Sequence, residues 1–238
     1  MTRVARGLDG CPDGWVVVTL ADGAVSDVEV VTSLAELPDD GTPVGIDIPV
    51  GLLDVAARDA DVAARSLLPG RGSSVFNAPP RCVIDAWAAG EVTDHADASA
   101  RARAVTGRGI SQQAWRLVPK IAEVDREVGD GRAVLEVHPE LAFTLVVGEP
   151  LPRKRSWAGV TTRRAVLGAL GVDLPDRFPG DATCAPDDVL DAAICAWVAD
   201  GAALGLPPVR LPDPPTQTDG GRPVVIQARA TPPVRPSP

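Results

Sequence analysis

The chain has 238 residues, of which 45% are hydrophobic and 23% charged, a composition typical of a folded protein. The net charge of −9 argues against nonspecific duplex binding through a basic face, but it does not exclude a nucleic-acid substrate. Four scattered cysteines and two histidines argue against a zinc site. With no signal segment and no apolar run of membrane length, we expect free thiols in the cytoplasm and no membrane partner.

The first 50 residues predict four strands. Residues 4–9, 15–20 and 25–31 are rich in β-branched residues, and turn signals at Pro12-Asp13-Gly14 and Asp22-Gly23 separate them. A short helical segment follows Ser33, and a further strand covers 44–48. Three antiparallel strands, a helix and a strand that returns beside the first indicate an α/β layer plan.

The middle of the chain predicts a helical insertion followed by a second interior strand. Its expected helices cover 54–68, 80–89, 97–105 and 111–128, with a Gly- and Pro-rich loop at 70–80. The expected strand covers 133–137, and a helix covers 161–170. The last helix begins at Pro186 with acidic residues in its first turn, and we expect it to end just before Gly201.

The domain organisation is predicted from a change in composition near residue 206. Residues 1–206 are expected to form one domain. Residues 207–238 are Pro-rich and are expected to be a disordered tail, although Val224-Val225-Ile226 fits a short strand.

Carboxylates interrupt three apolar runs and open the last helix. Asp9, Asp47 and Glu136 each lie near the C-terminal end of a predicted strand, where open α/β sheets place their ligands. Asp188 and Asp191 lie about 60° apart on the last helix, so both can face one site. Buried carboxylates are usually paired or bind metal, and oxygen ligands suit Mg²⁺ or Mn²⁺. Two such ions could clamp the attacking and leaving oxygens of a phosphoryl transfer.

These residues belong to six sequence blocks, which are Asp9-Gly10-x-x-x-Gly14-Trp15, Gly45-Ile46-Asp47-Ile48-Pro49, Ser74-Val75-Phe76-x-Ala78-Pro79, Gly109-x-Ser111-x-Gln113-x-Trp115 with Lys120-Ile121, Glu136-Val137-His138-Pro139-Glu140, and Asp187-Asp188-x-x-Asp191-Ala192. In this order they resemble the domain-of-unknown-function 429 family, described as predicted nucleases with the ribonuclease H-like fold. The resemblance extends from about residue 7 to about residue 205.

The resemblance implies a ribonuclease H-like mixed five-stranded sheet with the first strand central, flanked by helices. It implies a metal-dependent nuclease or related phosphodiesterase that hydrolyses nucleic acid or another phosphodiester with Mg²⁺ or Mn²⁺. The expected catalytic metal ligands are Asp9, Asp47, Asp188 and Asp191, and Glu136 is a further candidate ligand. Candidate substrate-binding residues within the blocks are Ser74, Gln113, Lys120 and His138.

Each of these residues also has a structural interpretation. Asp9 can brace the first hairpin, Asp47 can cap a loop, and Asp188 suits a helix N-terminus whatever the function. The basic cluster Arg153-Lys154-Arg155 is interpreted as an ordinary solvated face. Two other functions stay open. One is a phosphotransferase of the actin–hexokinase–sugar kinase type, which the chain length disfavours, and the other is a non-catalytic descendant that binds nucleic acid or protein.

Overall fold

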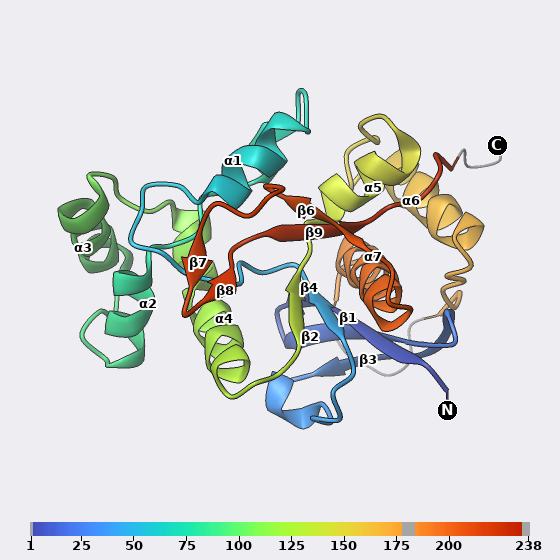
Figure 1. Ribbon diagram of the computed structural model, residues 1–238, viewed down its shortest axis with the longest axis horizontal. Helices are drawn as coiled ribbons and strands as arrows, with labels where there is room; N and C mark the ends of the chain where they lie inside the picture. The colour runs from blue at the N-terminus through green and yellow to red at the C-terminus, as the bar shows by residue number, and fades with distance from the viewer. Residues whose placement is uncertain (1, 178–183, 235–238) are drawn as a thin grey trace. The chain divides into compact units, whose positions relative to one another are not determined.

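The computed structural model describes residues 2–177 and 184–234 and contains a five-stranded sheet (Figure 1). The strand order is β3-β2-β1-β4-β5, and the strands are β1 Val4–Cys11, β2 Gly14–Ala21, β3 Ala24–Val31, β4 Val44–Ile46 and β5 Val134–Glu136. The first three strands pair antiparallel, whereas β4 pairs parallel with both β1 and β5. This mixed sheet confirms the predicted α/β class and is compatible with the ribonuclease H-like fold.

The first hairpin forms where its turn residues predict it. Cys11 pairs with Gly14, so Pro12 and Asp13 make the connection between β1 and β2. Gly14 has φ +138, and a Cβ there would lie 2.1 Å from the carbonyl oxygen of Val31 on β3. Glycine is therefore required both for the backbone conformation and for the approach of the third strand.

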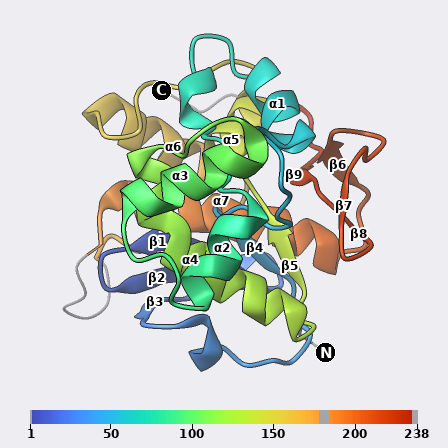
Figure 2. The same cartoon turned by 90° about the vertical axis from the view of Figure 1, so that its left-hand side faces the viewer.

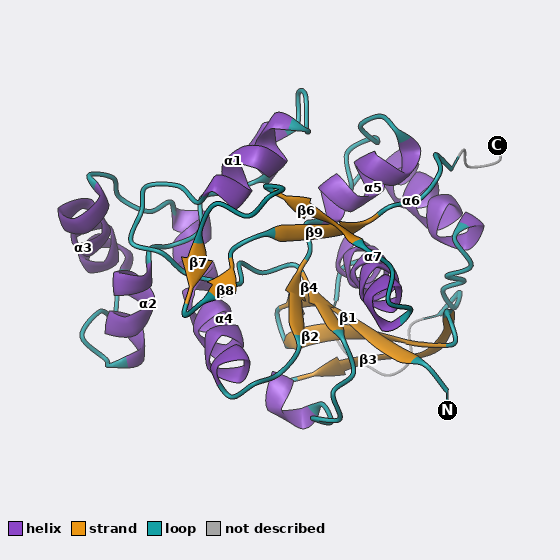
Figure 3. Ribbon diagram, in the orientation of Figure 1, coloured by secondary structure: helices purple, strands orange, loops and turns teal. Residues whose placement is uncertain are grey.

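The chain divides into two compact units. The first contains residues 1–47, 131–209 and 227–238, and the second contains residues 48–130 and 210–226. The sheet belongs to the first unit, together with the 3₁₀ helix η1 Leu34–Glu36 and the helices α5 Pro139–Val147, α6 Trp157–Ala169 and α7 Pro186–Ala203 (Figure 3). Of these, α7 packs on β1, β2 and β4, and its buried side chains form the core with one face of the sheet.

All three α-helices of the first unit differ from the sequence-based expectation, and α6 begins at Trp157, four residues before the expected start at 161. Helix α5 was not predicted, because its segment is apolar on all sides and ends in β-branched residues; its start is marked by Pro139 at the first position. Helix α7 continues past Gly201, where a Cβ would lie 2.8 Å from Cδ of Arg229. Gly201 therefore marks a close approach, and Gly205, with φ +70, follows the helix end.

The second unit is the predicted helical insertion. It contains α1 Asp59–Ser66, the 3₁₀ helix η2 Gly72–Ser74, α2 Arg81–Ala88, α3 His95–Thr106 and α4 Gln112–Gly129. Helices α2, α3 and α4 pack against one another (Figure 2). Helix α1 begins five residues later than expected, at Asp59, and its preceding residue Arg58 is buried in an ion pair with Asp61. Within the described ranges, no helix has both the length and the apolar character needed to cross a membrane.

The Pro-rich segment after residue 206 contains strands where disorder was expected. In its described part, β6 Pro208–Leu211 pairs with β9 Ile226–Arg229, and β7 Thr218–Asp219 pairs with β8 Arg222–Pro223. Four apolar side chains of this segment are buried: Val224, Val225, Ile226 and Ala228. The domain boundary at 206 stays a prediction, and residues 235–238 lie outside the described part.

Candidate metal centre

Two glycines bring α7 into backbone contact with the sheet. Gly7 of β1 and Gly45 of β4 are partners in the parallel ladder. A Cβ at Gly7 would lie 2.0 Å from the carbonyl oxygen of Ala192, and one at Gly45 would lie 2.3 Å from that of Cys195. Any side chain at either position would therefore push α7 away from the two strands.

The same geometry places the three acids on one side of the sheet. Strand side chains alternate, so Asp9 shares a face with Gly7, and Asp47 shares that face with Gly45. On α7, Asp191 precedes Cys195 by one helical turn and therefore lies on the same side of the helix. The two strand acids and the helix acid consequently face each other beyond the C-terminal ends of the parallel strands.

One carboxylate oxygen from each of Asp9, Asp47 and Asp191 lies within 4.8 Å of the other two. Asp9 and Asp191 are buried, with Asp191 only 1% exposed. Asp9 Oδ1 accepts a hydrogen bond from Gly10 N at 2.7 Å. Asp191 Oδ1 is one of the few buried side-chain atoms in the described residues that have no hydrogen-bond partner. A buried carboxylate oxygen without a donor is costly, and a metal ion is a group that would satisfy it.

Burial gives the triad an unusual affinity for protons. Burial, together with the charges of Asp47 and Asp191, raises the pKa of Asp9 well above its ordinary value. Burial raises the pKa of Asp47 to about 6. Burial also raises the pKa of Asp191 to about 7, against the opposing effect of the Lys154 charge. Even with Lys154 beside it, the triad therefore holds protons near neutral pH unless a metal ion displaces them.

Lys154 is the basic residue of this centre, and the sequence-based interpretation missed it. Its Nζ lies 2.5 Å from Asp191 Oδ2 and 3.6 Å from Asp187 Oδ2. Although burial lowers the pKa of Lys154, the charges of Asp191, Asp47 and Asp9 hold it above its ordinary value. Lys154 was grouped with two exposed arginines as a solvated face, and its only distinguishing signal is that lysine is rare in this Arg-rich chain.

The remaining acidic candidates do not join the triad. Asp188 Oδ2 accepts a hydrogen bond from Ala185 N at 3.1 Å and thereby caps the start of α7, although its charge still contributes to the raised pKa of Asp9. Glu136 is in register with Ile46 of β4, and Ile46 with Leu8 of β1. Glu136 therefore points to the opposite face of the sheet from Asp9 and Asp47 and does not belong to the triad.

The substrate-binding candidates belong to different units of the chain. His138 lies in the first unit, where its Nδ1 accepts a hydrogen bond from Leu141 N at 3.2 Å and caps α5. Ser74 ends η2 in the second unit, and its hydroxyl donates to Arg71 O at 2.8 Å. Gln113 and Lys120 lie on α4, also in the second unit.

The sheet and the triad define an α/β protein with a buried acidic centre that could hold a metal ion. The family model described as "Protein of unknown function (DUF429)" matches residues 7–217, and the chain belongs to this family. No curated protein and no solved structure matches the chain.

Proposed function

We propose that the protein is a metal-dependent nuclease or related phosphodiesterase whose centre is formed by Asp9, Asp47 and Asp191. The observation that carries this proposal is the unpartnered Asp191 Oδ1 within a triad of carboxylates from three separate elements. Carboxylate oxygens are the ligands that Mg²⁺ and Mn²⁺ prefer, so the donor set fits such a cation. When bound, the cation would lower the pKa of a water molecule and stabilise charge on the leaving oxygen.

The chain's own residues then have distinct tasks. Asp9 and Asp47 are fixed by the ladder, because Asp47 N donates to Leu8 O at 3.1 Å and holds the end of β4 against β1. Asp191 is fixed by the glycine-mediated contact of α7 with these strands. Such preorganised ligands need no rearrangement when a cation binds. Asp188, one turn before Asp191, is our candidate for a further ligand.

The connection that carries Lys154 is suited to contact a nucleic-acid substrate. Arg155 beside it is 81% exposed, and Trp157 at the start of α6 is 84% exposed. Arginine neutralises phosphate, and an exposed tryptophan offers a surface on which a base stacks. We propose that these two residues bind the strand beside the acidic centre.

Lys154 favours a second candidate function, a non-catalytic binding protein. Its ammonium group already compensates part of the negative charge of the triad, at 2.5 Å from Asp191 Oδ2. If this pair is permanent, the centre is a structural ion pair and the fold serves only for binding. The two functions differ in their response to metal, because only the first requires a cation to compete with Lys154.

The test combines cleavage assays with melting curves. The purified protein is incubated with Mn²⁺ or Mg²⁺ and single-stranded, duplex, hybrid or branched nucleic acid, and its melting temperature is measured with and without metal. We expect cleavage of at least one substrate and metal-induced stabilisation of the folded state. Asp47→Asn should abolish both.

The control is Asp200→Asn on α7, the helix that carries Asp191; Asp200 pairs with Arg3 and Arg229 at 2.7 and 3.1 Å. This change should cost about 1–3 kcal/mol of stability through lost charged hydrogen bonds but leave cleavage and the metal response intact. Metal stabilisation without cleavage of any of these substrates would support the metal centre but contradict the nuclease. Absence of any metal stabilisation would refute the metal centre and favour the binding protein, in which the Lys154 pair is structural.

A further inference from the structure

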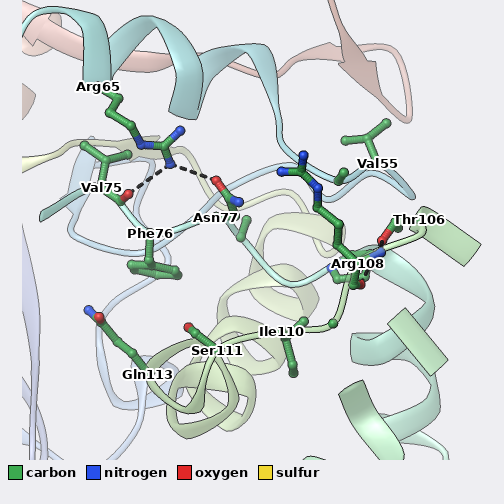
Figure 4. Close-up of a pocket in the computed structure, with 14 residues that line it drawn as sticks. Val55, Arg65, Val75, Phe76, Asn77, Thr106, Arg108, Ile110, Ser111 and Gln113 are labelled. Atoms are coloured by element: carbon green, nitrogen blue, oxygen red, sulfur yellow. Dashed lines mark hydrogen bonds between the residues drawn. The ribbon is translucent and has the colours of Figure 1, made fainter. Parts of the chain in front are cut away.

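A pocket within the second unit is lined by residues from two stretches of the sequence, 55–80 and 106–113. Its walls come from α1, from the loop after η2, and from the connection between α3 and the first turn of α4. Its volume is about 390 Å³. In Figure 4, Arg65, Phe76 and Gln113 lie on one side of this space and Arg108 lies on the other.

The pocket is basic in a chain that is acidic. It contains Arg65 and Arg108, and none of the 14 described residues that line it is Asp or Glu. Arg65 Nη2 donates to Val75 O at 3.0 Å and to Asn77 Oδ1 at 2.7 Å, so its guanidinium is fixed against the wall (Figure 4). Among the described residues, no carboxylate pairs with the exposed Arg108 guanidinium. Two arginines without an acidic partner attract an anion.

The other lining residues extend this anion site toward a planar, polar ligand. Asn77 uses its oxygen for Arg65, so its amide NH₂ is directed to donate elsewhere. Gln113 supplies a second amide with both donor and acceptor groups. Phe76 is one of only three phenylalanines in a chain without tyrosine, and its ring lines the pocket. An aromatic ring beside amide groups is a combination that binds a nucleobase by stacking and hydrogen bonding.

We propose that this pocket binds a nucleoside monophosphate group, with the phosphate held by Arg65 and Arg108 and the base against Phe76. The volume falls in the range of small-molecule sites and suits one nucleotide. The group could come from a free nucleotide or from the 5′-phosphorylated end of a strand, since both present the same chemistry. The proposal does not depend on the acidic centre, because all its residues belong to the second unit and none is an expected metal ligand.

Calorimetric titration of the full-length protein in EDTA tests the site without any contribution from divalent cations. The ligands are AMP, GMP, CMP and UMP, adenosine without phosphate, inorganic phosphate, and an oligonucleotide with and without a 5′-phosphate. We expect saturable binding of at least one monophosphate or of the 5′-phosphorylated oligonucleotide, and no binding of adenosine or of the unphosphorylated oligonucleotide. Binding of a free monophosphate alone would identify the ligand as a nucleotide, and binding of the 5′-phosphorylated oligonucleotide would identify it as the end of a strand.

The variants separate the phosphate contact from the base contact. Arg108→Met should weaken binding about tenfold or more, because a charge-assisted hydrogen bond is lost. Phe76→Leu should weaken binding of the nucleotide but not of inorganic phosphate. The matched control is Arg116→Met, an exposed arginine of α4 that does not line the pocket, and it should bind normally. Absence of saturable binding by every phosphorylated ligand up to about 1 mM, or unchanged affinity in Arg108→Met, would overturn the proposal.

Discussion

Gly7 and Gly45 lie side by side in neighbouring parallel strands, and both meet the backbone of α7 where any other residue would place a Cβ. Two positions further along each strand, the same face carries Asp9 and Asp47. The glycines thus set the distance between helix and sheet, and that distance determines whether Asp191 reaches the strand acids. Packing and the candidate site are consequently two results of one contact.

Replacing either glycine with alanine should therefore disrupt the protein. A Cβ at 2.0 Å or 2.3 Å from a backbone oxygen cannot be relieved by a side-chain rotation, so α7 must shift. We expect Gly7→Ala and Gly45→Ala each to cost about 1–3 kcal/mol or more, measured by urea denaturation, and to weaken the Mn²⁺ response. Gly129→Ala on α4 is the control, since nothing lies within 4 Å of its Cβ position, and it should be neutral or slightly stabilising. Equal effects at all three sites would contradict the close-approach argument.

Lys154→Met tests whether the ammonium group competes with a metal ion for the triad. The change removes the positive charge at 2.5 Å from Asp191, so the metal-free protein should lose stability. Mn²⁺ should then stabilise the variant more strongly than the wild type, because the metal no longer competes with the ammonium. Arg155→Met, one residue away and 81% exposed, should change the metal response much less. A Lys154→Met protein with weakened metal stabilisation would show that Lys154 does not compete for the site.

The raised pKa values predict how stability depends on pH. Asp47 and Asp191 have pKa values of about 6 and about 7 in the folded protein, above the ordinary value of 3.8. At pH values between about 4 and about 7, the folded state binds more protons than the unfolded state. The contribution of the triad to the free energy of unfolding therefore falls as the pH rises through this window. Urea denaturation in EDTA should find Asp47→Asn more stable relative to wild type at pH 8 than at pH 5. A stability difference between Asp47→Asn and wild type that does not change from pH 5 to pH 8 would contradict the raised pKa values.

Metal binding should show the opposite trend with pH. A cation replaces the protons that the triad holds, so its affinity should increase as pH rises from 5 to 8. Isothermal titration with Mn²⁺ in buffers of different ionisation enthalpy would count the protons released. Binding that releases no protons at pH 6 would mean that the cation occupies another place.

Trp157→Ala tests the proposed contact with nucleic acid separately from the proposed catalysis. Trp157 is 84% exposed, so its loss should leave the melting temperature unchanged. Stacking with a base contributes about 1–3 kcal/mol, and we expect binding of single-stranded substrate to weaken accordingly. Val105→Ala, an exposed apolar side chain on α3, is the control for nonspecific effects. Unchanged affinity in fluorescence anisotropy would remove Trp157 from the proposed surface.

Deletion of residues 207–238 tests the domain boundary. The segment buries Val224, Val225 and Ile226, and Arg229 lies over the Trp197 ring at 4.6 Å while pairing with Asp200 at 3.1 Å. We expect the deletion to cost at least about 3 kcal/mol. Arg229→Met alone should cost less, about 1–3 kcal/mol. An unchanged melting temperature on deletion would support the boundary at 206 expected from composition.

The sheet could be predicted from sequence because local signals agree with its tertiary arrangement. β-branched runs separated by strong turns define the antiparallel strands, and the buried acids mark where β1 and β4 end. The candidate triad follows from those positions once α7 is known to cover the sheet. The face on which Glu136 lies could not be predicted, because it depends on register, and composition alone does not determine the register of three-residue strands such as β4 and β5.

Other features depend on contacts that sequence patterns do not encode. Lys154 reaches the triad only because of the path of the connection between α5 and α6, and no periodicity marks that path. In the Pro-rich segment, average composition hides the apolar residues Val224, Val225 and Ile226, which are buried. Gly201 has the signature of a helix end, but it lies inside α7 at the point where the Arg229 side chain of β9 passes the helix.

The insertion between β4 and β5 has a consequence for folding kinetics. Asp47 is the last residue of the first unit before the chain enters the second, and β5 pairs with β4 only after residues 48–130 have been spanned. The hairpin strands β1 to β3 are local and can form early, whereas β5 and α7 require long loop closures. The triad can therefore be complete only once α7, Pro186–Ala203, has packed on the strands. A metal ion bound to the triad would therefore mainly slow unfolding of the protein. A nascent chain whose α7 is still inside the ribosome would lack the acidic centre.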